Sequence, residues 1–125
     1  ALRAPDMQLQ QQAYYNLGRL AWDRGDLDRA AQLSRHAVEL DASASDAKVL
    51  LALCLERQGR LDEAARLLES VLAALPWHAE ALFNLGRLEL LRGRPAAARP
   101  LFARFARTAP DDPDALEASA LSAEK

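Results

Sequence analysis

The sequence predicts an all-α protein made of stacked helix-turn-helix repeats, because the same residues return at a constant interval. Gly25, Gly59 and Gly93 are 34 residues apart, and each has a leucine eight positions before it and an alanine five positions after it. The leucines are Leu17, Leu51 and Leu85, and the alanines are Ala30, Ala64 and Ala98. A period of this length is typical of helical arrays in which each unit buries its apolar face against the next.

The interval divides the chain into three units and a terminal segment. We expect repeats at 11–44, 45–78 and 79–112, followed by a capping helix at 113–124, all within a single domain spanning 1–125. Half of the residues are hydrophobic, which is enough for a buried core in one small domain.

The first helix of the middle repeat shows the helical period directly. Ala47, Leu51, Cys54 and Leu55 stand at offsets of 0, 4, 7 and 8, which places them on one face of a helix. We expect the helix to end at Gly59, because glycine adopts the left-handed conformation of a helix C-terminus without steric cost.

The second helix of the same repeat has the matching pattern. Ala64, Leu68, Val71 and Leu72 form its inner face, and Pro76 prevents its continuation because proline has no N–H to donate. The repeat is therefore predicted as helix, tight turn and helix.

The third repeat and the terminal segment contain further helix signals. Pro95 suits a first helical position, and Asp112 followed by Pro113 suits an N-cap and the start of the capping helix. Glu89 stands on a face that is otherwise apolar. Either it pairs with Arg92 three positions later, or that helix is slightly rotated.

Composition excludes several classes of function. The net charge of −2 gives no bulk attraction to nucleic acid or to an anionic membrane, and no apolar run is long enough for membrane insertion. The single cysteine, Cys54, is expected to be a buried, reduced thiol. His36 and His78 have no partner at metal-ligand spacing, and no catalytic or phosphate-binding motif occurs, so we expect no enzyme activity, cofactor or metal.

The chain begins at Ala1 rather than at methionine, which suggests a segment of a longer protein. The segment as given favours a cytoplasmic location, with the periplasm as the alternative if a signal was removed. Fourteen arginines against two lysines are typical of a GC-rich bacterial genome.

The landmarks in all three units closely resemble the tetratricopeptide repeat (TPR) family, whose pattern combines Leu-Gly, a following aromatic or small residue, Ala and a late proline. They are Tyr14, Leu17, Gly18, Ala21, Ala30 and Ser34; Leu51, Ala52, Leu55, Ala64, Leu68 and Pro76; and Leu82, Leu85, Gly86, Ala98, Phe102 and Pro110. The resemblance implies a right-handed superhelical solenoid. It also implies a concave groove, lined by the first helix of each repeat, that binds other proteins.

Some members of this family hold the acidic tails of heat-shock chaperones with a clamp of lysine, arginine and asparagine side chains. At the matching positions this chain has Tyr15, Arg19, Leu50, Glu80 and Asn84, of which only Arg19 loosely fits. The sequence therefore argues against binding of chaperone tails.

Helical spacing selects the residues that would face the groove, one stripe round from the core face. They are Tyr15, Asn16, Arg19, Trp22, Val49, Leu50, Leu53, Phe83, Asn84, Arg87 and Leu90. Asparagine amides bind peptide backbones and arginines bind carboxylates, so we expect a protein or peptide partner with apolar anchors and an acidic group. The predicted function is a non-enzymatic protein–protein interaction module with an adaptor or assembly role. Two alternatives stay open: a structural domain that self-associates into a homo-oligomer within a larger bacterial protein, and a regulatory domain of an enzyme.

Overall fold

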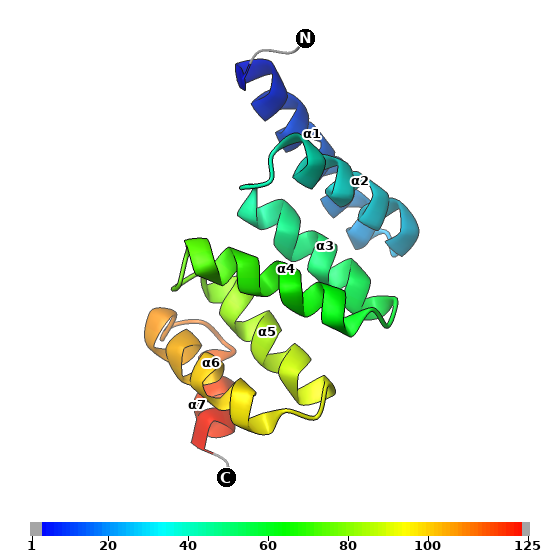
Figure 1. The fold of residues 1–125 in the computed structure, drawn as a ribbon. Coiled ribbons are helices and arrows are strands. Elements are labelled where there is room, and N and C mark those ends of the chain that lie inside the picture. The colour runs from blue at the N-terminus through cyan, green and yellow to red at the C-terminus, as the bar shows by residue number, and fades with distance from the viewer. Residues whose placement is uncertain (1–3, 124–125) are drawn as a thin grey trace. The chain divides into compact units, whose positions relative to one another are not determined.

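The computed structural model describes residues 4–123, which form seven α-helices and no strand (Figure 1). The helices are α1 (Ala4–Asp23), α2 (Leu27–Leu40), α3 (Ser45–Arg57), α4 (Leu61–Ala74), α5 (Ala79–Leu91), α6 (Pro95–Thr108) and α7 (Ala115–Ala123). The predicted all-α class and the succession of helix, tight turn and helix are confirmed.

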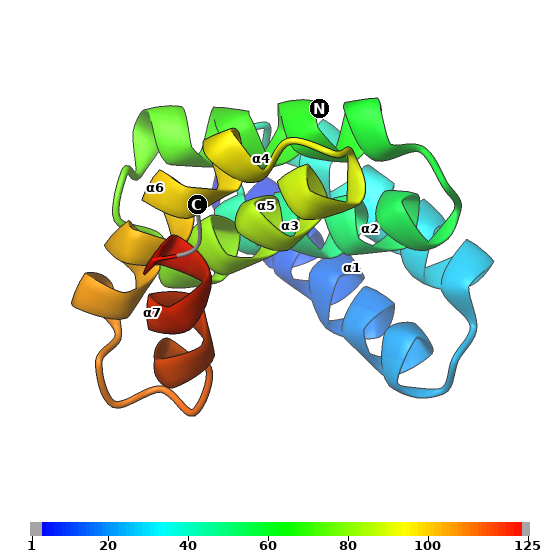
Figure 2. The ribbon, with the colours of Figure 1, turned by 90° about the horizontal axis from the view of Figure 1, so that it is seen from below.

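The chain falls into two compact units that divide between Ala64 and Ala65. In the N-terminal unit α1 packs against α2, and α2 packs against α3. In the C-terminal unit α5 packs against α6, and α6 packs against α7, as both ribbon views show (Figures 1 and 2).

The three glycines of the constant interval end the first helix of each repeat, as predicted. Gly25, Gly59 and Gly93 have φ angles of +79°, +80° and +75°, in the region where any side chain is strained. The next residue closes each turn by donating its N–H five positions back, as Arg60 does to the carbonyl oxygen of Leu55 at 2.9 Å. This hydrogen bond is the one that a left-handed C-terminal residue makes possible.

The core of the N-terminal unit contains the face predicted for the middle repeat. Leu51, Cys54 and Leu55 are fully buried. Gly18 lets α1 approach this core, because a Cβ there would lie 3.1 Å from Cδ2 of Leu50. Ser34, also buried, donates its hydroxyl to the carbonyl oxygen of Ala30 at 2.7 Å, so this polar group is satisfied inside its own helix.

The core of the C-terminal unit is built around Phe102. It forms a buried cluster with Leu82, Ala98, Phe105 and Ala118, which come from α5, α6 and α7. The ring of Phe102 occupies the space beside Gly86, where a Cβ would lie only 2.8 Å from two ring atoms. Helices α5 and α6 therefore meet closely at this glycine.

The capping helix starts later than predicted. Helix α7 begins at Ala115 rather than at 113, because the side chain of Asp112 accepts from the backbone N–H of Asp114 at 2.9 Å and forms a turn before the helix. The predicted end at 124 lies outside the described residues. Ala115 and Ala118 are buried beneath the helix, whereas Leu116 points to solvent.

The expectation for Glu89 is settled in favour of pairing. Its side chain is buried, and Oε1 lies 2.6 Å from Nη1 of Arg92, with Nη1 of Arg94 at 3.8 Å from Oε2. Pro95 is the first residue of α6, as predicted. A buried carboxylate is tolerated on this face because it is paired and hydrogen-bonded.

Candidate functional site

The first helix of the N-terminal unit presents four of the predicted binding residues at its surface. Tyr15 and Trp22 are partly buried, and Asn16 and Arg19 are exposed. All four belong to α1, whose helical geometry keeps them on one broad side. This part of the prediction is compatible with contact with a partner.

Trp22 is joined to α3 by a cation–π contact. The guanidinium of Arg57 lies 5.0 Å from the centre of the Trp22 ring. Sequence reasoning placed Trp22 near the groove but did not anticipate its contact with Arg57. The guanidinium lies over the ring, so an aromatic surface and a cation stand together, and this pair is suited to an apolar anchor next to an acidic group.

Two predicted residues on α3 do not reach the surface. Val49 and Leu50 are only 1% and 2% exposed. Leu50 is buried because the missing side chain of Gly18 leaves a space that its Cδ2 approaches. Both residues therefore act in packing, and the apolar contact surface of α3 is reduced to the partly buried Leu53.

The sequence Asn-Leu-Gly-Arg-Leu occurs at both 16–20 and 84–88, and the asparagines of the two copies make different hydrogen bonds. Oδ1 of Asn16 accepts from Nε2 of Gln12 at 3.1 Å, whereas Oδ1 of Asn84 accepts from Nη1 of Arg87 at 3.0 Å. In both cases the amide oxygen is used within its own helix. Each amide therefore keeps its NH2 group as a donor and a second lone pair on its oxygen as an acceptor toward a peptide backbone.

Helix α5 contributes to a pocket of about 250 Å³ within the C-terminal unit. It is lined by Ala79, Glu80, Phe83, Asn84, Phe105, Asp112 and Asp114. The ring centres of Phe83 and Phe105 lie 4.9 Å apart and give the pocket an aromatic wall. The pocket thus combines two predicted binding residues with three carboxylates.

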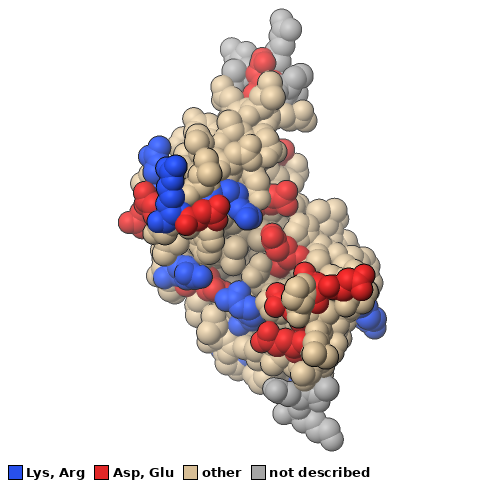
Figure 3. All heavy atoms as spheres, turned by 180° about the vertical axis from the view of Figure 1, so that it is seen from behind, with Lys and Arg blue, Asp and Glu red and all other residues tan. Residues whose placement is uncertain are grey.

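The charge of this pocket differs from the sequence expectation. The carboxylates of Glu80, Asp112 and Asp114 belong to exposed residues, and acidic side chains gather over the C-terminal unit, low in Figure 3. These carboxylates would repel an acidic group of a partner and attract a cationic one. Sequence reasoning missed the pocket because Asp112 was interpreted only as the N-cap of the capping helix.

Of the other two predicted residues of α5, Leu90 is exposed, as is its neighbour Leu91. Arg87 is partly buried and bonded to Asn84. These side chains do not line the pocket.

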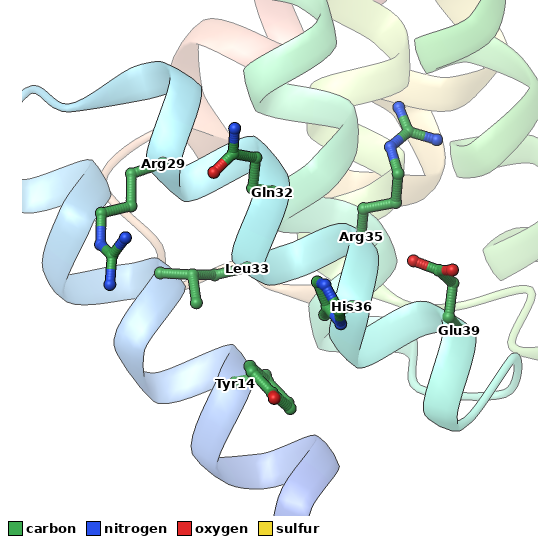
Figure 4. A pocket seen from close by; sticks show the side chains of 7 residues that line it. All are labelled: Tyr14, Arg29, Gln32, Leu33, Arg35, His36 and Glu39. Carbon is green, nitrogen blue, oxygen red and sulfur yellow. The ribbon is translucent and has the colours of Figure 1, made fainter.

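A different pocket lies between α1 and α2, and none of the predicted binding residues lines it. It has a volume of about 380 Å³, and Figure 4 shows that its lining comes from Tyr14 of α1 and from six residues of α2. The Tyr14 and His36 rings stack with their centres 5.1 Å apart. Both residues were treated as isolated landmarks in the sequence, and only the pairing of the helices brings them together.

The segment between α4 and α5 presents an aromatic side chain at the surface. Trp77 is 55% exposed. The guanidinium of Arg104 lies 5.2 Å from the ring centre and that of Arg107 lies 5.9 Å from it, while Nη2 of Arg104 donates to the carbonyl oxygen of Pro76. The tryptophan is held by cations from α6 and stays accessible.

The described residues contain neither a membrane-spanning helix nor a cluster of metal ligands. Within residues 4–123 no helix is both long enough and apolar enough to cross a bilayer. In the same part of the chain, no group of three or more histidine, cysteine or carboxylate side chains is arranged to hold a metal ion.

Comparison of the sequence with known families identifies its class. A family profile described as Tetratricopeptide repeat matches residues 55–121, and a second profile with the same description matches residues 1–46 and 15–76. The chain belongs to the tetratricopeptide repeat family. No curated protein sequence matches it.

Solved structures show the same fold. YrrB, described as a TPR protein with an unusual peptide-binding site, is 26% identical with a TM-score of 0.80; the match covers 89% of this chain and 57% of YrrB. The first TPR of Spaghetti (RPAP3), bound to the HSP90 peptide SRMEEVD, is 15% identical with a TM-score of 0.84 and 92% of each chain covered. The Yersinia enterocolitica type III secretion chaperone SycD, in complex with a peptide of the translocator YopD, is 16% identical with a TM-score of 0.79, covering 89% of this chain and 88% of SycD.

Proposed function

We propose that the chain is a non-enzymatic protein–protein interaction module with an adaptor or assembly role, and that it binds a partner segment through the first helices of its repeats. Membership of the TPR family supports this proposal, as do the peptide complexes of Spaghetti and SycD. The observation that carries it is the pocket of the C-terminal unit, because an aromatic wall, an amide and a carboxylate rim together form a side-chain recognition site.

The pocket is suited to a lysine or arginine side chain of the partner. The stem of such a side chain packs on Phe83 and Phe105, and its charged end meets the carboxylates of Glu80, Asp112 and Asp114. Asn84 lines the pocket, and its amide nitrogen can donate to a carbonyl oxygen of the partner backbone while its amide oxygen accepts from Arg87.

The N-terminal unit supplies a complementary set of contacts. Arg19 is exposed, and the guanidinium of Arg57 stacks on Trp22, so an acidic group of the partner finds two cations beside an aromatic surface. Tyr15 and Leu53 extend the apolar part of this set. We therefore expect the acidic group of the partner to bind to this unit, and a basic group of the partner to bind in the pocket of α5.

Selection from a displayed random-peptide library tests the proposal, with wild-type protein and Glu80→Lys as parallel baits. Glu80 is exposed, so this substitution preserves the fold. We expect the wild type to enrich peptides that carry Arg or Lys beside an aliphatic or aromatic residue, and Glu80→Lys to lose that enrichment. Glu69→Lys, with the same charge change at an exposed position of α4, is the matched control and should select as the wild type does.

The selected peptides are then titrated into isotopically labelled protein and followed by NMR. Shifts should centre on Phe83 and Asn84, and Phe83→Ala should weaken binding by roughly tenfold or more, because buried aromatic anchors dominate such interfaces. Enrichment that is the same on Glu80→Lys, or shifts that avoid α5 altogether, would contradict the assignment of this pocket.

A further inference from the structure

One face of α1 exposes side chains whose equivalents in α3 and α5, the first helices of the next two repeats, are buried. Leu17 is 48% exposed and Leu20 is 50% exposed. One and two repeats later, the equivalent side chains are all buried; they are Leu51 and Cys54 in α3, and Leu85 and Leu88 in α5. In a stacked array these positions meet the second helix of the preceding repeat. The described part of the chain supplies no such helix for α1.

Helix α1 is also longer than its equivalents. It has 20 residues, whereas α3 and α5 have 13 each. At 1.5 Å per residue its length is about 30 Å. The additional turns at its N-terminal end include Leu9, which is 72% exposed, so they add apolar surface on the outside.

The exposed face follows the seam of a coiled coil. Successive positions on this face are separated by 4, 3, 4, 3 and 4 residues. This alternation keeps one stripe of side chains facing a partner helix. The residues at these positions are Asp6, Gln10, Ala13, Leu17, Leu20 and Arg24. All but Arg24 belong to α1, and Arg24 is the next residue after its end.

We propose that two copies of this chain associate through antiparallel pairing of their α1 helices. The six seam positions are spaced symmetrically before and after position 15 in the sequence. An antiparallel pair related by a twofold axis therefore places complementary residues opposite one another. Asp6 faces Arg24 of the second copy, and Ala13 faces Leu17 of the second copy, each twice by symmetry. The small alanine opposite the leucine allows close approach at the centre.

The charges select the antiparallel arrangement. A parallel pair in register would set Asp6 against Asp6 and Arg24 against Arg24, and like charges in contact are unfavourable. The antiparallel pair instead forms an ion pair at each end of the apolar centre. Gln10 faces Leu20 of the second copy, and the neighbouring Leu9 adds apolar contact there.

This surface is separate from the one proposed for the partner segment. Tyr15, Arg19 and Trp22 lie on the opposite side of α1, since successive residues are about 100° apart around a helix. Pairing of α1 helices and binding of a partner are therefore compatible, and each can fail without the other.

Sedimentation velocity over a concentration series reaching the millimolar range tests the proposal on the intact chain. We expect a reversible dimer, and we expect Leu17→Asp to raise its dissociation constant by about tenfold or more, because two carboxylates would enter an apolar centre. Leu116→Asp, on the exposed surface of α7, is the matched control and should dimerise as the wild type does. Circular dichroism checks that both variants remain helical.

A charge exchange tests the geometry without touching the apolar positions. Asp6→Arg and Arg24→Asp change exposed residues and should each weaken the dimer. An equimolar mixture of the two variants should restore it, because in the mixed pair every end again joins an arginine to an aspartate. A chain that is monomeric throughout the series would overturn the proposal. So would a dimer whose dissociation constant is unchanged by Leu17→Asp, Asp6→Arg and Arg24→Asp. A third contrary result would be weakened dimers of Asp6→Arg and of Arg24→Asp with no recovery when the two variants are mixed.

Discussion

Replacing Gly86 by alanine should destabilise the protein, although alanine is the better helix former. The new Cβ would lie 2.8 Å from Cε1 and Cζ of Phe102 and 3.1 Å from its Cδ1. The Phe102 ring is fully buried, and its centre lies 5.7 Å from that of Phe83. The ring therefore has no open space into which it can retreat, and the contact must be relieved by movement of α5 against α6.

The size of the effect follows from two opposing contributions. Alanine favours the helix by about 1 kcal/mol relative to glycine, and overpacking a core costs about 1–3 kcal/mol. Gly86→Ala should therefore lose about 1 kcal/mol in net stability, within a range of zero to about 2.

Gly18→Ala is the matched comparison, because Gly18 occupies the same position in the first repeat. There a Cβ would meet Cδ2 of Leu50 at 3.1 Å, the movable end of a side chain, and other atoms only at 3.5 Å. This variant should be neutral or gain up to about 1 kcal/mol. The two variants should thus differ by about 1–2 kcal/mol, or roughly 0.5–1 M in the midpoint of urea unfolding.

Urea unfolding followed by circular dichroism measures the difference. In a double-mutant cycle, Phe102→Leu should cost less in the Gly86→Ala background than in the wild type, because the smaller side chain removes the clash. If both glycine variants gained stability equally, the close approach at Gly86 would not be a constraint, and the reasoning would be refuted.

Two further predictions concern buried polar groups. Burial raises the pKa of Cys54 from 9.0 to about 11, against a smaller opposing effect of the hydrogen bond with Ser34. Between these values the folded state keeps a proton that the unfolded chain releases, so this contribution to stability is full below pH 9 and is lost as the pH rises toward 11. The stability of wild type relative to Cys54→Ala, measured by urea unfolding, should fall across that window, and a constant difference would contradict the prediction. Glu89→Gln should cost about 1–3 kcal/mol, because it weakens a charge-assisted hydrogen bond inside the protein. Arg94→Ala should cost much less, since its distance of 3.8 Å and its exposure make that pair weak; thermal unfolding should rank the two variants in this order, and equal losses would show that burial of the pair is not decisive.

Much of the fold could be predicted because it depends on local spacing. The turn at Gly59 and the buried face of Leu51 and Cys54 follow from a glycine at a helix end and from apolar residues at helical intervals. The same reasoning gave the pairing of Glu89 with Arg92 as one of two alternatives, since residues three apart in a helix are neighbours.

The candidate binding surface was harder to predict, because the exposure of a side chain depends on which neighbouring helices cover it. Leu50 stands at the position equivalent to the surface residues Asn16 and Asn84, yet it is buried because it extends toward the gap at Gly18. The pocket beside Phe83 depends on Asp112, which follows it in the chain by nearly one repeat. Spacing along one helix cannot reveal either relation.

The close contact between Gly86 and Phe102 has an evolutionary consequence. The residues at these two positions in the other repeats are Gly18 with Ser34 and Ala52 with Leu68, so the bulkiest partner in this chain stands opposite a residue with no side chain. Positions 86 and 102 should therefore vary together among homologues, with alanine at 86 accompanied by a residue smaller than phenylalanine at 102. Because Phe102 also supports the Phe83 wall of the pocket, such exchanges would reshape the proposed binding site without altering any residue that lines it.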